Sequence, residues 1–314
     1  ADHISLAFNS SGDPYVAFRD YSNFYKATVM KFDGISWVTV GSAGFSAGGA
    51  SNNSLAFNSS GEPYVAYTDG GNSLKATVKK FNGTSWITVG SVGFSAGSAN
   101  YISLALNSSG EPYVAFSDGG SAGKASVMKF NGTSWVMVGS AGFSAGATDN
   151  IRLSLNSSGQ PYVAYGDAGN LGKATVMKFD GTSWVTVGTA GFSAGAADGG
   201  SICLALNNSG EPYTAYTDAG NSYKATVMKF VDLSAGLKDI NALSSISIYP
   251  NPTKNSINFS EYSNVQLTSV TGQIIVDLKN TTSIDLSSQP SGIYFLTLTN
   301  NNGKVLQRSK IVKE

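Results

Sequence analysis

The chain has 314 residues; Lys and Arg account for 20 of them and Asp and Glu for another 20, so the formal net charge is zero and only 13% of residues are charged. Such sparse, balanced charge provides no basic surface, which argues against a nucleic-acid partner, and no apolar run reaches the ~18 residues of a membrane span. With 37 Gly and 41% hydrophobic residues, the composition indicates a turn-rich chain that can bury a core.

A repeat of 49 residues occupies most of the chain. Its clearest marker is a single Trp, which recurs at that spacing at Trp37, Trp86, Trp135 and Trp184. Each unit holds four short segments with alternating apolar residues, enriched in β-branched and aromatic types and without helical periodicity. Repeats of this kind are typical of β-propellers. The sequence therefore predicts an all-β fold: a propeller of about five four-stranded blades over 1–232, a linker over 233–245 and a small Ig-like β-sandwich over 246–314.

The third unit illustrates the expected blade. Segments 102–106 and 112–116 form a first hairpin, and segments 124–130 and 134–138 form a second one across an Asn-Gly turn. The first segment carries a small residue at the same position in every unit. We therefore expect this strand to lie innermost, where neighbouring sheets crowd around a central axis.

The fifth unit departs from the pattern, because Lys229-Phe230 is followed by neither the turn nor the Trp segment. An open sheet edge invites aggregation, and closed propellers complete their last blade with a strand from the other end of the chain. We therefore expect one of two arrangements. Either sequence upstream of Ala1 supplies the strand, or the last blade lacks its outer strand and has an exposed edge.

The loop between the second and third segments varies between units and is the expected ligand-binding region. It carries Tyr21, Phe24 and Tyr25 in the first unit and Tyr223 in the fifth. Aromatic rings beside Asn and Asp suit the faces of sugars or the surface of another protein, and repeated weak sites would gain from multivalency. The structural alternative is that these rings pack on the neighbouring Gly-Phe-Ser-Ala-Gly loop.

Groups that could form a catalytic site are scarce. His3 is the only histidine and Cys203 the only cysteine, so we predict no catalytic triad, no metal and no cofactor, and we expect Cys203 to be a small buried hydrophobe. A glycosidase needs only two carboxylates. One Asp ends the second segment of every unit, however, and is expected to cap its loop or pair with the Lys that follows. These residues are Asp20, Asp69, Asp118, Asp167 and Asp218.

Four motifs occur in order in the last 69 residues, 246–314. They are Ile-Tyr-Pro-Asn-Pro from residue 248, Val-Thr-Gly-Gln from 270, Pro-Ser-Gly-Ile-Tyr from 290 and Lys-Ile-Val-Lys from 310. The segment resembles the type A C-terminal sorting domain of the type IX (Por) secretion system of Bacteroidetes. The resemblance implies that the outer-membrane translocon is a partner and that the domain serves as an export address. The address residues implied are Pro250, Asn251, Pro252, Gly272, Gly292, Tyr294 and Lys310.

These features predict a monomeric protein that is secreted or attached to the outer bacterial cell surface. We expect a binding or adhesion module rather than an enzyme, with a glycan or a surface protein as its ligand. The rival hypothesis is a polysaccharide-acting or sialidase-like hydrolase whose catalytic part is missing or degenerate. The third hypothesis is that the protein is a spacer without any ligand.

Overall fold

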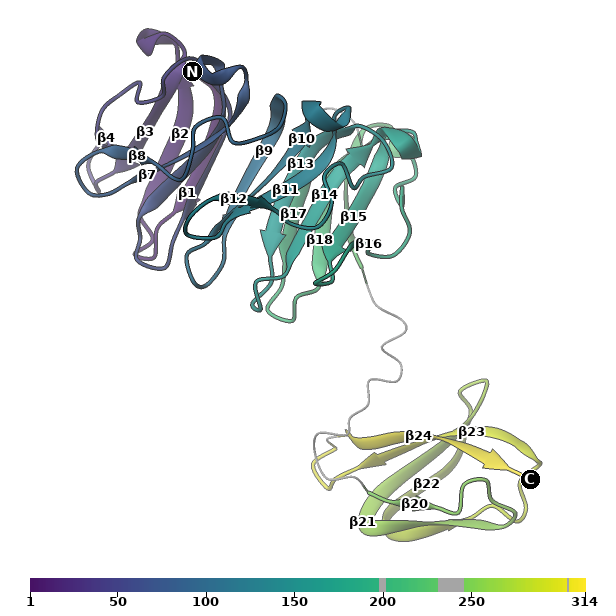
Figure 1. The fold of residues 1–314 in the computed structure, drawn as a ribbon. Coiled ribbons are helices and arrows are strands. Elements are labelled where there is room, and N and C mark those ends of the chain that lie inside the picture. The colour runs from purple at the N-terminus through teal and green to yellow at the C-terminus, as the bar shows by residue number, and fades with distance from the viewer. Residues whose placement is uncertain (198–201, 231–245, 304) are drawn as a thin grey trace. The chain divides into compact units, whose positions relative to one another are not determined.

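The structure is a computed structural model that describes residues 1–197, 202–230, 246–303 and 305–314 (Figure 1). It divides into two compact units, residues 1–231 and 232–314. The first unit is a series of antiparallel sheets and the second is a single five-stranded sheet. The expected linker over 233–245 lies outside the described residues.

Each blade is a meander in which consecutive strands pair, as in the order β1-β2-β3-β4. The first strands are β1 (Asp2–Phe8), β5 (Ala50–Phe57), β9 (Ala99–Leu106), β13 (Thr148–Leu155) and β17 (Cys203–Leu206). The second strands are β2 (Pro14–Asp20), β6 (Pro63–Asp69), β10 (Pro112–Asp118), β14 (Pro161–Asp167) and β18 (Pro212–Asp218). The third strands are β3 (Lys26–Phe32), β7 (Lys75–Phe81), β11 (Lys124–Phe130), β15 (Lys173–Phe179) and β19 (Lys224–Lys229). The fourth strands are β4 (Trp37–Thr39), β8 (Trp86–Thr88), β12 (Trp135–Met137) and β16 (Trp184–Thr186).

A one-turn 3-10 helix joins the second strand of each blade to the third. The Asp that ends the second strand caps it, as in Asp118, whose carboxylate accepts a hydrogen bond from the Gly120 N–H at 2.9 Å. The residue after the turn adopts a left-handed conformation, for example Phe24 with φ 55°. These turns are η1 (Tyr21–Asn23), η2 (Gly70–Asn72), η3 (Gly119–Ser121), η4 (Ala168–Asn170) and η5 (Ala219–Asn221).

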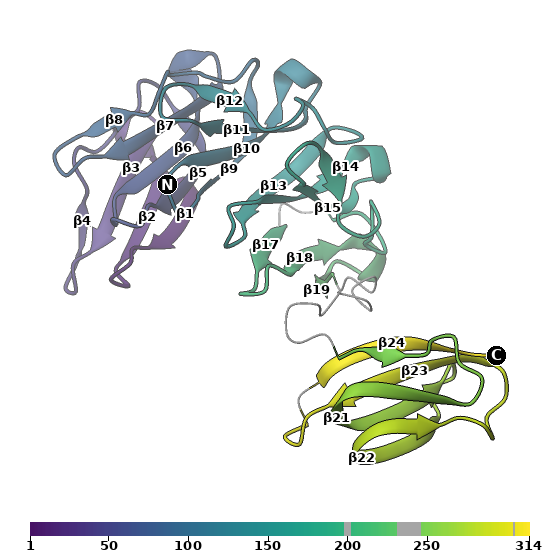
Figure 2. The same cartoon turned by 60° about the horizontal axis from the view of Figure 1, so that its bottom comes forward.

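The first strand of each blade is innermost, as the small residues predicted. Successive first strands contact each other, β1 with β5, β5 with β9, β9 with β13 and β13 with β17. In Figure 2 these strands lie on the inner side of the sheets, whereas β4, β8 and β12 lie on the outer side. Sheets stacked in this way bury both faces of the middle blades, which is why all seven residues of β10 are buried.

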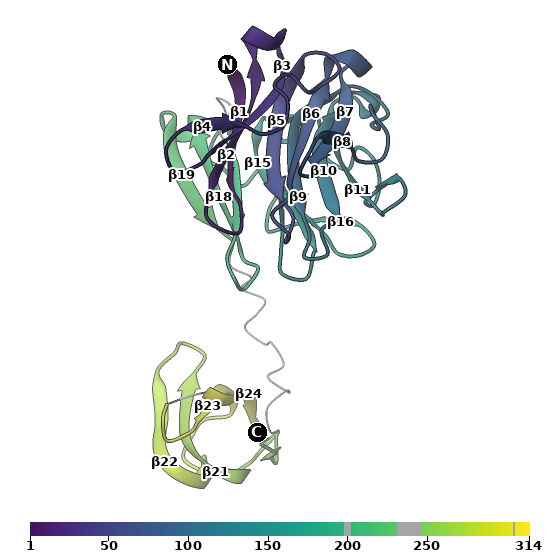
Figure 3. The same cartoon turned by 90° about the vertical axis from the view of Figure 1, so that its left-hand side faces the viewer.

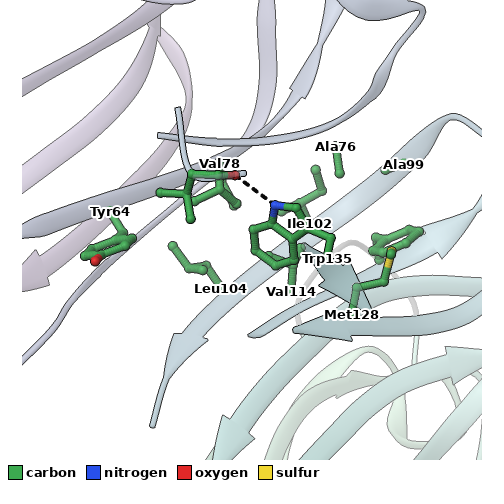
Figure 4. Close-up of a cluster of buried hydrophobic side chains, with 12 residues drawn as sticks. Tyr64, Ala76, Val78, Ala99, Ile102, Leu104, Val114, Met128 and Trp135 are labelled. Carbon is green, nitrogen blue, oxygen red and sulfur yellow. Dashed lines mark hydrogen bonds between the residues drawn. The ribbon is translucent and has the colours of Figure 1, made fainter. Parts of the chain in front are cut away.

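In blades two to four, a Trp at the start of the fourth strand joins the blade to the preceding one. The indole N–H of Trp135 donates to the Val89 carbonyl at 2.9 Å, and its ring stacks on Phe94 with centroids 4.0 Å apart. Gly90 (φ 70°) allows this approach, because a Cβ there would lie 2.9 Å from the indole. Figure 4 shows Trp135 in the buried cluster between the two sheets. The same contacts join Trp86 to Val40 and Phe45, and Trp184 to Val138 and Phe143.

The fifth blade has three strands, β17, β18 and β19, within the described residues. The residues that directly follow Phe230 lie outside them. Cys203 is exposed, so the expectation of a buried side chain is wrong. It occupies the place at which Ser5, Ser54 and Ser103 contact the next blade, and the described residues contain no blade beyond the fifth to cover it.

The second unit is one antiparallel sheet in the order β20-β21-β23-β24, with β22 on the other side of β21. Register shifts within the β21–β22 pair, between Asn258 and Ser263 among other places, bend these two long strands around a core that includes Leu267, Leu296 and Leu298 (Figure 3). The strands are β20 (Ile248–Tyr249), β21 (Ser256–Ser269), β22 (Ile274–Asp285), β23 (Gly292–Thr299) and β24 (Val305–Lys313).

Candidate binding site

A cavity of about 530 Å³ lies among the first strands of the first four blades. Its volume is in the range typical of small-molecule sites. Every lining residue belongs to β1, β5, β9 or β13. The polar groups that line it include His3, Asn52, Asn53, Tyr101, Asn150 and Arg152.

Four of these residues occupy the same place in successive repeats and share an unusual backbone conformation. They are His3 (φ 48°), Asn52 (φ 51°), Tyr101 (φ 52°) and Asn150 (φ 52°). In each blade the pairing of first and second strands is irregular at this point, which marks a β-bulge. Bulges re-aim side chains, and positive φ is costly for residues such as Tyr. The bulge therefore places one side chain per blade at the cavity, and we call these four residues the axial rim.

The side chain at the rim position differs between blades that are otherwise similar in sequence. The Trp, the capping Asp and the Gly-Phe-Ser-Ala-Gly loop recur in blades one to four, but the rim position reads His, Asn, Tyr and Asn. These residues were not among those predicted from the sequence, because variation between units was expected in the loops. The signal that could have found them is their 49-residue spacing within the first strand, combined with unlike side chains.

Arg152 interrupts a second repeated contact. In the first three blades this position is Ser, whose hydroxyl accepts a hydrogen bond from a backbone N–H of the next first strand. The pairs are Ser5 with Leu55, Ser54 with Leu104 and Ser103 with Leu153, at 3.0, 2.9 and 3.0 Å. Arg152 instead donates to the Ile151 carbonyl at 2.9 Å and, within the part of the chain described, forms no ion pair. A guanidinium carries five donors, so this site offers hydrogen bonds to an anionic or hydroxyl-rich group.

Asn53 adds an acceptor whose hydrogen-bonding capacity is unused. Its side chain is buried, and its amide donates long hydrogen bonds to the His3 and Ala50 carbonyls at 3.3 and 3.4 Å. Its Oδ1 is buried and has no partner among the described residues. A buried acceptor left unsatisfied costs stability.

The titratable groups of the axial rim are tuned by burial. Partial burial and the nearby charge of Arg19 lower the pKa of His3, whereas the carboxylate of Asp2 acts in the opposite direction. Burial also raises the pKa of Tyr101, and the charge of the Asp149 carboxylate and its hydrogen bond with the phenol act in the same direction. No Asp or Glu lines the cavity in the described structure, and the paired carboxylates of a glycosidase are therefore not at this place.

An ion pair connects the cavity to the first loop. The Arg19 guanidinium binds both carboxylate oxygens of Asp2, and this hydrogen bonding lowers the pKa of Asp2 to about 2. The Tyr21 hydroxyl also donates to Asp2, at 2.9 Å. Asp2 precedes His3, so this loop and the axial rim lie at the same end of blade one.

The predicted loop residues do not form one site. Tyr21 and Tyr25 contact each other, with ring centroids 5.2 Å apart, and Arg19 lies 5.9 and 5.7 Å from them. Phe24 is 84% exposed and Tyr223 64% exposed, and neither makes a ring contact in the described residues. The Phe of the Gly-Phe-Ser-Ala-Gly loop stacks on the Trp of the next blade in the first three cases.

The repeated Asp residues are structural, as the capping hypothesis predicted. Asp118 is buried and accepts hydrogen bonds from Gly120, Ser121 and Ser126 at 2.9, 3.2 and 3.0 Å. It lies opposite Lys124 in the strand register, but the described residues show no ion pair between them. Nor do they contain a group of three His, Cys, Asp or Glu side chains arranged to hold a metal ion.

The first and last sorting motifs meet in the second unit. The Asn251 amide donates to the Lys310 carbonyl at 2.7 Å, and its oxygen accepts from the Val312 N–H at 2.9 Å. Its side chain thus pairs with β24 as a backbone would. Pro250, Asn251, Pro252 and Lys310 are all exposed.

The two middle motifs lie at the same end of this sheet. Tyr294 pairs with Ser269 on one side and with Ile311 on the other. The turn after Ser269 contains Gly272 (φ 83°), and Gly292 begins β23; both glycines are exposed. Tyr294 is buried and its hydroxyl donates to the Pro290 carbonyl at 2.8 Å, so this residue holds the motif in place.

Comparison with known proteins identifies the second unit. Residues 247–314 match the family model described as a secretion system C-terminal sorting domain. This confirms the predicted resemblance, and the protein is an exported one, secreted or attached to the cell surface. Across the described residues, no helix has the length and apolar character needed to cross a membrane. No curated protein matches the chain in sequence.

Two solved structures of low sequence identity are similar to the chain. The Aleuria aurantia lectin, in complex with Fucα1-6GlcNAc, is 14% identical with a TM-score of 0.50, and the match covers 99% of this chain and 95% of the lectin. PorZ, a surface component of the type IX secretion system of Porphyromonas gingivalis, is 15% identical with a TM-score of 0.46 over 99% of this chain. The match covers 44% of PorZ, so the chain spans less than half of that protein.

Proposed function

We propose that the propeller is the glycan-binding module of an exported protein and that the axial cavity is its binding site. The observation that carries this proposal is the divergence of the axial rim among otherwise similar blades. A residue needed to build a blade recurs in every blade, whereas a ligand requires different groups at different places. The fold shared with a fucose-binding lectin supports the class of ligand.

The chemistry of the cavity favours a hydroxyl-rich ligand with an anionic group. The side-chain amides of Asn52 and Asn150 can donate to and accept from sugar hydroxyls. Tyr101 offers a ring face on which a sugar can stack. Arg152 is positioned to pair with a carboxylate or sulfate, as in an acidic polysaccharide.

The test is binding of the chain to an array of neutral, uronate-containing and sulfated glycans, followed by calorimetry on the best ligand. Arg152→Ser installs the residue of blades one to three, so the fold should persist. We expect binding to weaken about tenfold or more, because a hydrogen bond to a charged group contributes about 1.5–3 kcal/mol. Tyr101→Asn installs the rim residue of blades two and four and should also weaken binding.

The matched controls are Phe24→Ala and a Tyr21→Ala, Tyr25→Ala double variant, which alter the exposed loop. Binding that survives Arg152→Ser but is lost in the loop variant would place the ligand on the loop and overturn the axial site. Absence of binding to every glycan would refute the function. Depolymerisation of a glycan during the assay would establish the enzymatic alternative.

A further inference from the structure

A second cavity, of about 90 Å³, lies between blades four and five where other blade pairs hold a Trp ring. In blade four, Val187, Gly188 and Phe192 stand at the places that Val138, Gly139 and Phe143 occupy in blade three. In blade three those residues receive the indole of Trp184. In blade four they line the cavity together with Met228 and Phe230.

Comparison of Gly139 with Gly188 shows that the described residues of blade five lack the indole found in the other blades. A Cβ on Gly139 would lie 2.9 Å from Phe179 and 3.0 Å from the Trp184 indole. A Cβ on Gly188 would lie 2.9 Å from Phe230 and would meet no indole. The aromatic neighbour from the third strand is thus in place, whereas the one from a fourth strand is absent among the described residues. Phe192 makes an edge contact with Tyr216 instead of stacking on an indole.

The hydroxyl of Thr226 is independent evidence that the described part of blade five lacks the contacts of a fourth strand. In blades one to four, the Thr or Ser in the middle of the third strand accepts a hydrogen bond from a Gly N–H in the loop that follows the fourth strand. These pairs are Thr28 with Gly44, Thr77 with Gly93, Ser126 with Gly142 and Thr175 with Gly191, at 2.9 to 3.0 Å. In blade five the equivalent atom, Thr226 Oγ1, is buried and has no partner within the described residues.

The outer strand of this blade also presents an open face. β19 pairs with β18 and, in the described part of the chain, with no other strand. Val227 and Met228 on β19 are 68% and 41% exposed. The sequence that continues from it, residues 231–245, contains no aromatic residue and cannot supply an indole.

We propose that blade five binds an extended segment that carries a Trp and has the repeat's own fourth-strand sequence, provided by polypeptide other than residues 1–314. Its Trp would pair opposite Phe230, as Trp184 pairs opposite Phe179. The indole fills the cavity, donates to the Val187 carbonyl and stacks on Phe192. A Gly seven residues later, the Trp184-to-Gly191 spacing, donates its N–H to Thr226. The cavity, the orphaned hydroxyl and the free strand edge together specify this segment.

The probe is a synthetic peptide with the sequence of residues 180–196, which contains the Trp, the Gly and the Phe-Ser-Ala-Gly loop. Titration into the full chain should give saturable binding of one peptide per chain and raise the unfolding temperature. A control peptide with Trp184→Ala should bind about tenfold more weakly or not at all, because it lacks both the stacking and the indole hydrogen bond.

Two matched variants of the chain locate the site. Thr226→Val removes the orphaned hydroxyl and should weaken peptide binding without destabilising the free chain. Thr175→Val removes a hydroxyl that is already bonded, so it should destabilise the free chain and leave peptide affinity unchanged. Equal binding of the Trp and Ala peptides, or equal effects of the two variants, would overturn the proposal. A chain that dimerises in solution and fails to bind the peptide would show that a second copy covers this face instead.

Discussion

Two regions of the propeller differ in what the 49-residue repeat preserves: the interfaces between blades, and the axial rim. At the interfaces, one set of contacts is copied: an indole donates to a Val carbonyl and stacks on a Phe in three successive pairs. At the rim, one backbone conformation is copied in four blades, but its side chains are His, Asn, Tyr and Asn. The interfaces therefore repeat both their geometry and their side chains, whereas the rim repeats only its backbone geometry.

The difference shows which residues hold the scaffold and which residues are available for recognition. An interface residue must satisfy a neighbour of fixed shape, so a change in one blade costs stability unless the neighbour changes as well. A rim residue faces a cavity and is free to vary. Arg152 combines the two cases. It replaces the Ser that forms an interface hydrogen bond in the first three blades, and it places a cation at the cavity.

The largest expected effect tests the copied interface. Trp135→Ala should destabilise the chain by about 3–5 kcal/mol, because the ring is buried between two sheets and leaves a cavity. Trp37→Ala is the matched control: this residue starts the same strand in blade one, but it is 44% exposed and no preceding blade covers it in the described residues. Urea denaturation measures both. Equal losses would show that Trp acts within its own blade, and the interface account would fail.

A smaller expected loss of stability distinguishes the carboxylate of Asp118, which belongs to the scaffold, from that of Asp149, which lies beside the axial rim. Asp118→Ala leaves the Gly120 N–H and the buried Ser126 hydroxyl without their acceptor and should cost about 1–3 kcal/mol. Asp149→Ala removes an exposed carboxylate beside Tyr101 and should leave the unfolding midpoint nearly unchanged while lowering the pKa of that phenol. Denaturation and spectroscopic titration of the Tyr residues provide the two measurements. A large loss of stability in the Asp149 variant would place this residue in the scaffold.

The smallest effect concerns the ion pair beside the axial rim. The Arg19 guanidinium depresses the pKa of Asp2 from 3.8 to about 2 in the folded chain. The resulting stabilisation is therefore present above about pH 4 and is lost as the pH falls toward 2. NMR titration should find the low value in the native protein and a return toward 3.8 in Arg19→Gln. An unchanged Asp2 pKa in that variant would assign the shift to another cause.

The sequence was informative wherever the repeat copied a residue. The spacing of Trp135 and its equivalents predicted the blades, and the recurrence of Asp118 and its equivalents predicted the caps. The sorting motifs, including Asn251 and Lys310, also predicted a recognisable domain. The loop aromatics were weaker evidence: Tyr21 lies near the cavity end of blade one, but Phe24 and Tyr223 stand apart and exposed.

The sequence by itself determined the strands, their order and the export address, because alternation, turn residues and ordered motifs are local properties of the chain. The tertiary structure decided which faces of those strands meet. It brought His3, Tyr101 and Arg152, which lie 98 and 51 residues apart (101 − 3 and 152 − 101), to one cavity, and it left Thr226 without its partner in blade five. Such juxtapositions depend on the stacking of whole sheets, which no short stretch of sequence specifies.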